Sequence, residues 1–89
     1  MPQIKKEIVI RNHQGLHARP AAMFVQIASK FNASITVQKG NEKVNGKSIM
    51  GILTLGAQQN TSIILEIEGE DAQEAMRELE QLLFKEELT

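Results

Sequence analysis

The spacing of apolar residues changes repeatedly along the chain, and the order of these changes is the strongest constraint on its fold. In three segments apolar and polar side chains alternate, which is typical of a strand with one buried face. Their inward residues are Ile4, Ile8 and Ile10, then Ile35 and Val37, and finally Ile63, Leu65 and Ile67. Lys6 interrupts the first of these faces. Turn-forming residues from Lys39 to Glu42 precede a fourth, short strand at Lys43 and Val44, so the middle of the chain predicts a hairpin.

Three further segments show apolar residues at helical spacing. The first runs from Ala18 to Phe31, with Pro20 in the first turn, where its missing N–H costs nothing. The second follows Ser48, a good N-cap, and ends at Gly56. Because this second helix is short and unusually apolar, we expect tertiary contacts to support it.

The last helix has the clearest apolar stripe, formed by Ala72, Ala75, Met76, Leu79, Leu82 and Leu83. Asp71, followed three residues later by Glu74, predicts a capping box with Asp71 as the cap. The full element order is therefore β-α-β-β-α-β-α. This order predicts an α+β fold, in which helices cover one face of an antiparallel sheet and the other face meets water.

The length of the chain, 89 residues, suits one domain, so we expect residues 1–89 to form a single unit with one small core. Such a chain has little room for both a catalytic cleft and a cofactor domain. We therefore expect no cofactor, and a protein that works with a partner instead of catalysing a reaction alone. Residues 84–89 predict a fraying helix end.

The composition excludes several classes of partner. Lys and Arg total 10 against 11 Asp and Glu, and the only aromatic residues are three Phe, whereas nucleic-acid binders carry basic patches and stacking aromatics. The chain has no Cys, which excludes a disulfide framework and a thiolate zinc site. It has no run of 18 apolar residues, and residues 1–6 do not resemble a signal peptide. We expect a cytoplasmic protein that neither binds nucleic acid nor inserts into a membrane.

Residues 15–20, Gly-Leu-His-Ala-Arg-Pro, place His17 immediately before the first predicted helix. The first N–H groups of a helix lack intrahelical acceptors, and the positive end of its dipole favours anions, so this helix start predicts an anion site. Arg19 adds a planar, permanently charged group that matches phosphate oxygens. We expect the backbone N–H groups of Ala18 and Arg19 to hold a phosphoryl group carried on His17.

Histidine chemistry suits reversible transfer, because an unperturbed imidazole titrates near pH ~6.5 and much of it is a neutral nucleophile at pH 7. No Asp or Glu occurs between Gln14 and Phe31 to act as a base for water or as a Mg²⁺ ligand. The segment therefore favours storage of a phosphoryl group over its hydrolysis. From the residues alone, an exposed loop histidine beside a solvated Arg19 explains the pattern equally well.

Two segments resemble the HPr family, the histidine-containing phosphocarriers of the phosphoenolpyruvate-dependent sugar phosphotransferase system. They are GLHARPA at residues 15–21 and VNGKSIMG at residues 44–51, and the resemblance extends over nearly the whole chain. The family fold that it implies is an open-faced β-sandwich, a four-stranded antiparallel sheet with three helices on one face. This fold agrees with the element order predicted above.

The resemblance implies roles for individual residues. In the family, the histidine before Ala-Arg-Pro accepts a phosphoryl group on Nδ1 from enzyme I and passes it to the IIA domains of sugar permeases. His17 matches that histidine, and Arg19 matches the phosphate-binding arginine. One regulatory subgroup lacks the histidine, so the presence of His17 argues against that subgroup. We take a monomer as the default oligomeric state.

Ser48 has two candidate roles. As an N-cap it contributes ~1 kcal/mol relative to Ala. In Gram-positive members of the family the corresponding serine is phosphorylated by an ATP-dependent kinase, which implies HPr kinase/phosphorylase and a transcriptional regulator as further partners. A phosphate at this helix start would add a charge of about −2 and is expected to block docking without unfolding the chain. We expect the capping role, whereas the regulatory role stays open, because relatives without such a switch also carry this serine.

A docking surface for enzyme I and IIA domains is implied around His17. Its candidate residues are Ala22, Met23, Lys47, Ile49, Met50 and Leu53. Methionine suits several partner shapes because it is flexible and polarizable. Ile49 and Met50 are consecutive in a helix and cannot both point inward, so at least one is expected at the surface. For Met23 and Leu53, burial in the core is an equally good explanation.

Three other functions are compatible with parts of this pattern. A regulatory module acting through Ser48 and the apolar residues would tolerate the loss of His17, and a carrier in a nitrogen-related phosphotransferase branch would share the histidine motif. A hydrolase with His17 as base would need a nearby nucleophile or acidic residue, and residues 15–20 contain neither.

A second histidine, His13, lies in the same loop as His17. Catalytic zinc usually has three protein ligands, so these two histidines do not predict a metal site.

Overall fold

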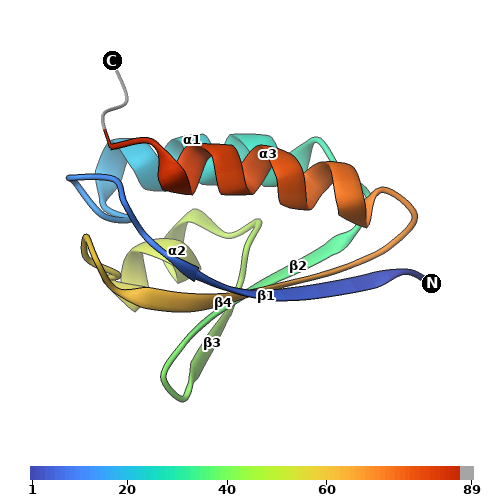
Figure 1. Cartoon of the computed structure of the whole chain (residues 1–89), viewed down its shortest axis with the longest axis horizontal. Helices are drawn as coiled ribbons and strands as arrows, with labels where there is room; N and C mark the ends of the chain where they lie inside the picture. The colour runs from blue at the N-terminus through green and yellow to red at the C-terminus, as the bar shows by residue number, and fades with distance from the viewer. Residues whose placement is uncertain (87–89) are drawn as a thin grey trace.

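The computed structural model describes residues 1–86, and its strands and helices follow the predicted order β-α-β-β-α-β-α (Figure 1). The elements are β1 (Gln3–Val9), α1 (Ala18–Ser29), β2 (Ser34–Lys39), β3 (Glu42–Asn45), α2 (Ile49–Leu55), β4 (Ser62–Glu68) and α3 (Ala72–Phe84). The first helix ends at Ser29, two residues before the predicted Phe31. Of the predicted fraying end, Phe84 is the last residue of α3, and residues 87–89 lie outside the described part of the chain.

All neighbouring strands of the sheet are antiparallel, in the order β1-β4-β2-β3. β4 lies in the interior of the sheet, between β1 and β2. In this register Ile67 is opposite Ile4 on β1 and opposite Ile35 on β2. Because residues in register point to the same side of a sheet, the alternating segments combine into one apolar face.

The helices cover this apolar face (Figure 1). α1 packs against α2 and α3, while α3 contacts β1 and β4 and α2 contacts β2 and β3. The largest fully buried side chains come from both layers: Phe24, Ile10, Leu16, Ile52, Ile63, Leu65, Ile67, Met76, Leu79, Leu83, Val37 and Pro20. The predicted open-faced β-sandwich, with three helices on one face of a four-stranded antiparallel sheet, is therefore confirmed.

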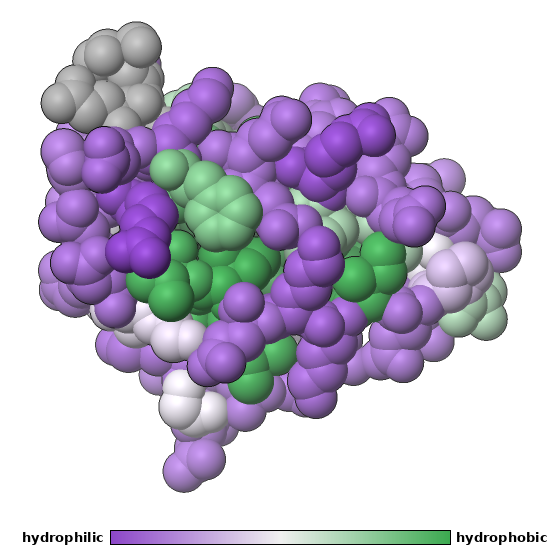
Figure 2. Space-filling view, viewed as in Figure 1, coloured by the Kyte–Doolittle hydropathy of each residue, from purple (hydrophilic) through white to green (hydrophobic). Residues whose placement is uncertain are grey.

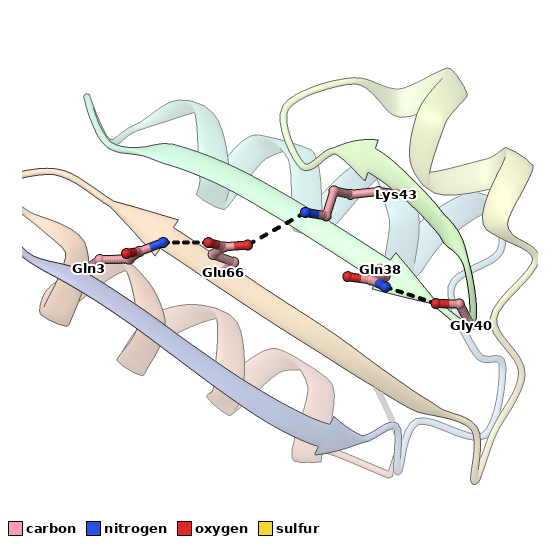
Figure 3. A network of polar contacts seen from close by, with 5 residues as sticks. All are labelled: Gln3, Gln38, Gly40, Lys43 and Glu66. Atoms are coloured by element: carbon pink, nitrogen blue, oxygen red, sulfur yellow. Dashed lines mark hydrogen bonds and ion pairs between the residues drawn. The ribbon is translucent and has the colours of Figure 1, made fainter.

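The opposite face of the sheet is polar and open. Figure 3 shows Glu66 of β4 between two side chains of the edge strands, where its carboxylate accepts from the Gln3 amide and lies 3.9 Å from the Lys43 Nζ. Gln38 donates to the Gly40 carbonyl at 2.9 Å beside them. Exposed pairs of this kind contribute little to stability, so the buried face and the backbone ladder hold the sheet together.

Lys6 interrupts the apolar face of β1 because it is paired with a helix. Its Nζ donates to Glu80 Oε1 on α3 at 2.9 Å. Next to this pair, Ile4, Met76 and Phe84 line a shallow groove between β1 and α3, and Figure 2 shows apolar side chains exposed on this face. The charged residue thus lies at the rim of the core, where its side chain is half exposed.

The predicted capping role of Asp71 is wrong. Asp71 precedes α3, but its side chain makes no hydrogen bond to that helix. Its two carboxylate oxygens accept instead from the backbone N–H groups of Asn32, at 2.9 Å, and Ala33, at 3.0 Å. These amides belong to the turn between α1 and β2, which tertiary packing brings to the start of α3. A charged acceptor that satisfies two amides at once is stronger than a single local cap.

The Asp71 bonds predict a measurable loss of stability. Asp71→Ala leaves two backbone N–H groups without their acceptor, so we expect the free energy of unfolding to fall by about 1–3 kcal/mol in urea denaturation. Glu70→Ala is the matched control, because Glu70 is the exposed neighbouring acid and should change stability by less than about 0.5 kcal/mol. Equal losses of unfolding free energy in the two variants would mean that the Asp71 bonds to Asn32 and Ala33 do not stabilise the fold.

Candidate functional site

The start of α1 leaves two backbone N–H groups without an acceptor. His17 is the N-cap residue, with an extended backbone (φ −100°, ψ −170°), and its carbonyl accepts the first helical hydrogen bond from the Ala21 N–H at 2.8 Å. Pro20 has no N–H to offer. Within residues 1–86, the N–H groups of Ala18 and Arg19 therefore have no acceptor, so they are able to donate hydrogen bonds to an anion.

The structure brings the predicted site residues together at the surface. His17, Ala18 and Arg19 are all exposed, and the His17 side chain makes no hydrogen bond to its own helix. Arg19 lies on the first turn, and its guanidinium has no ion-pair partner among the described residues. The first turn carries no acidic residue. An exposed histidine thus directly precedes two open backbone amides and an exposed arginine, and the turn contains no carboxylate to repel a phosphoryl group.

The loop that leads into His17 is held from the opposite layer. The Leu16 N–H donates to the Ala57 carbonyl, which follows α2, at 2.7 Å, and Leu16 itself is 1 % exposed. Gly15 adopts φ +64°, and a Cβ added there would lie 2.5 Å from that same Ala57 oxygen. A glycine is therefore required for two reasons, its positive φ and the close approach of another backbone.

Ser48 is confirmed as the N-cap of α2, because its Oγ accepts from the Gly51 N–H at 3.1 Å. The preceding Lys47 is half-buried, and its Nζ donates to the Phe31 carbonyl, just beyond α1, at 2.7 Å. The residue before the cap of α2 is thus bonded to the chain just after α1, while Ala57, two residues after α2, accepts from the loop before α1. Ser48 and His17 therefore lie toward opposite ends of α1.

The predicted docking residues differ in exposure. Ile49 and Leu53 are each 38 % exposed and Met50 is 69 % exposed, so both consecutive residues Ile49 and Met50 reach the surface. Ala22 is exposed on α1, whereas Met23 is half-buried and packs against the core. The exposed members are Ala22 on α1 and Ile49, Met50 and Leu53 on α2, and these two helices pack against each other. We call these residues the exposed strip. Ile49 and Met50 lie at the start of α2, toward the end of α1 that is far from His17, so the strip does not form a ring around His17.

Between Met1 and Glu86, no cluster of three or more His, Cys, Asp or Glu side chains is placed to hold a metal ion. None of the helices in this part of the chain combines the length and apolar character that crossing a bilayer requires.

An exposed histidine at a helix start with open amides, on an open-faced β-sandwich, is the arrangement expected of a small phosphocarrier domain. The model of the PTS HPr component phosphorylation site matches residues 4–85. The chain belongs to the HPr family of the phosphotransferase system.

Relatives and solved structures agree with this assignment. The phosphocarrier protein HPr of Neisseria meningitidis is 48 % identical over 80 residues, which cover 90 % of each chain. The HPr-like protein Crh of Halalkalibacterium halodurans is 43 % identical over 83 residues, covering 93 % of this chain and 99 % of that one. The crystal structure of HPr from Thermoanaerobacter tengcongensis has a TM-score of 0.86 and 52 % identity, covering 99 % and 100 % of the two chains. A dimer of HPr from the same organism gives a TM-score of 0.73 and 54 % identity, covering 89 % and 94 %.

Two residues that shape the loop before His17 were not predicted from the sequence. Asn12 is buried in the loop before His17, and the Ala57 carbonyl holds that loop from the other layer. Asn12 has a local signal, because Asn at the first position of a turn and Gly at the fourth, here Gly15, is typical of a type I turn. Ala57 has none, because its role depends on a backbone carbonyl that any residue would present.

Two glycine substitutions separate the backbone and steric demands at Gly15. Gly15→Ala meets both an unfavourable positive φ and the Ala57 oxygen, so we expect a loss of about 3 kcal/mol or more in unfolding free energy. Gly40→Ala is the matched control, because Gly40 has φ +60° with no atom within 4 Å of the added Cβ, and it should lose only about 1–2 kcal/mol. Urea melts of both variants measure the difference, and similar losses would rule out the Ala57 contact as the cause.

Proposed function

We propose that this chain carries a phosphoryl group on His17, accepting it from enzyme I, which derives it from phosphoenolpyruvate, and passing it to IIA components of sugar permeases. The observation that carries the proposal is the exposed His17 at the start of α1, next to the open N–H groups of Ala18 and Arg19. Membership of the HPr family supports the same role.

The geometry suggests how the chain's own groups act in transfer. The Nδ1 lone pair of His17 attacks phosphorus, and the new N–P bond forms as the bond to the donor breaks. The two amides and the Arg19 guanidinium stabilise the charge on the phosphoryl oxygens, which is the main demand of phosphoryl transfer. Because no acidic residue lies in the first turn, no carboxylate there activates water against the N–P bond. The phosphoryl group is thus kept for the next partner.

In this proposal the whole chain, residues 1–89, is one carrier domain that is a substrate of other enzymes and does not turn over anything alone. It needs no cofactor or metal. We propose the monomer as the transferring form, because the described residues already enclose one core. The dimer of the T. tengcongensis relative belongs to that protein, and transfer by this chain requires only that His17 stays exposed.

The docking surface in this proposal is the exposed strip on α1 and α2. Ile49, Met50 and Leu53 are exposed apolar side chains that a partner would cover, and Ala22 extends the surface along α1 toward His17. Lys47 contributes less as a contact than expected, because its ammonium already binds the Phe31 carbonyl. Met23 is half-buried against the core, so it offers a partner less surface than the other candidates.

Regulation through Ser48 is a second proposal, favoured by the exposure of its neighbours Ile49 and Met50. Phosphorylation by a kinase of the HPr kinase/phosphorylase type would put a charge of about −2 at the start of α2, next to the exposed strip. Such a modified chain would bind enzyme I poorly and present a different surface to a transcriptional regulator.

A purely regulatory module is the alternative function, and the 43 % identity to an HPr-like Crh protein favours it. Such a module would act through Ser48 and the exposed strip and would not need His17. A carrier in a nitrogen-related branch is a further alternative that keeps His17 and differs in its partners. The His17→Ala substitution separates these functions, because both carriers would lose their function and the regulatory module would keep it.

Phosphoryl transfer to His17 is tested with enzyme I and phosphoenolpyruvate. We expect mass spectrometry to show the gain of one phosphate that is lost in acid, and we expect no gain for His17→Ala. His13→Ala is the matched control, because His13 is the other histidine of the same loop and should leave the gain intact. An unmodified wild-type chain, or a phosphate that persists in His17→Ala, would contradict the proposal.

The regulatory role is tested with two substitutions at one position. Ser48→Asp introduces a charge at the helix start, where it is compatible with the fold, so its melting temperature should stay within a few degrees of wild type while phosphorylation by enzyme I slows. Ser48→Ala loses the cap, about 1 kcal/mol of stability, and should keep the transfer rate. A large fall in the melting temperature of Ser48→Asp relative to wild type would refute this role. So would an unchanged rate of phosphorylation by enzyme I.

A further inference from the structure

Asn12 is buried where a polar side chain is unusual. It lies in the loop between β1 and α1, and it is the one polar or charged residue among residues 1–86 that is buried, at 3 % exposure. A buried amide is unfavourable unless its donor and acceptor are both bonded. Within the described residues no buried side-chain nitrogen or oxygen lacks a partner, so the bonds of Asn12 compensate its burial.

Asn12 forms a tight turn with the residues that follow it. Its Oδ1 accepts from the Gln14 N–H at 2.9 Å, which forms an Asx turn, and its backbone carbonyl accepts from the Gly15 N–H at 3.0 Å. These two bonds set the path of the four residues that precede Leu16. The turn therefore depends on one side chain and on the glycine at its fourth position.

Asn12 also ties the loop to the far end of the chain. Its Nδ2 donates to the Lys85 carbonyl, just after α3, at 3.4 Å. The residues on either side of it bind the same stretch, since the Arg11 N–H donates to the Leu83 carbonyl at 2.9 Å and the His13 N–H donates to the Glu86 carbonyl at 3.0 Å. In Figure 1 the loop before α1 and the end of α3 accordingly lie at the same end of the molecule.

The turn is coupled to His17 through a single residue. Leu16 lies between Gly15 and His17, is 1 % exposed, and donates its N–H to the Ala57 carbonyl. Because its side chain is fixed in a close-packed core, a shift of Gly15 cannot be absorbed at Leu16 without changing the backbone of His17.

We propose that Asn12 is a positioning residue for phosphoryl transfer, a role that rests on the function proposed above. Its side chain joins the 12–15 turn to the segment after α3, and the joined loop presents the His17 ring at a fixed orientation to the amides of Ala18 and Arg19. Asn12 does not touch the phosphoryl group. It acts by limiting the orientations of His17, and transfer is sensitive to such orientation.

The test compares Asn12→Ala with Asn12→Ser. The alanine variant loses both side-chain bonds, whereas the serine hydroxyl still accepts from the Gln14 N–H but is too short to reach the Lys85 carbonyl. For Asn12→Ala we expect kcat for phosphorylation by enzyme I to fall on the order of 10- to 100-fold with little change in KM, because the exposed strip is untouched. Asn12→Ser should recover part of the loss, and it replaces the alanine variant if that chain fails to fold.

A matched control removes any effect of lower stability. Asp71→Ala also deletes a side chain that binds backbone groups of a neighbouring segment, but at the other end of α3. It should melt at a lower temperature with wild-type kcat. The amide resonances of Ala18 and Arg19 in NMR spectra should move in Asn12→Ala and stay in place in Asp71→Ala.

The outcomes distinguish the two proposals. A wild-type chain that accepts no phosphoryl group refutes the carrier function, while the amide resonances still decide whether Asn12 controls the loop. If the wild-type chain is phosphorylated and Asn12→Ala keeps its kcat, or loses no more than Asp71→Ala does, the positioning role of Asn12 is wrong. Unmoved Ala18 and Arg19 resonances in Asn12→Ala would also overturn it.

Discussion

The two open amides at the start of α1 are the constraint on which the candidate site depends. They exist because a helix cannot satisfy its own first N–H groups, and because Pro20 in the first turn leaves only Ala18 and Arg19 with a donor to offer. Such N–H groups bind anions, and the neighbouring His17 is the residue proposed to carry a phosphoryl group there. The rest of the fold keeps this helix start exposed while burying one face of α1.

That exposure is maintained by contacts from two other elements. The loop before α1 is bonded to Ala57 after α2 and to the chain after α3. Because these anchors come from distant parts of the sequence, the site forms only when all three helices have packed on the sheet. The small core therefore serves the site directly, because it anchors the loop before α1 and leaves His17 exposed. An anchored and exposed site suits a carrier that must offer the same group to different partners.

Much of the fold could be predicted from the sequence, because the signals are local and periodic. The alternating segments lead to strands and the stripe from Ala72 to Leu83 leads to α3, since each pattern places apolar side chains on one face. The prediction for Asp71 is wrong for an equally physical reason. Its local spacing to Glu74 fits a capping box, but tertiary packing offers Asp71 two amides from the α1–β2 turn, and it binds those instead.

The sequence by itself determined the order of the elements, the helix start at His17 and the presence of Arg19 in the first turn, because these depend on neighbouring residues. Only the tertiary structure decided which buried groups hold the loop, that Lys47 binds the end of α1, and that Ser48 and His17 lie toward opposite ends of that helix. Those features depend on backbone carbonyls brought together by packing. Every residue carries a carbonyl, so no sequence pattern marks the few that matter.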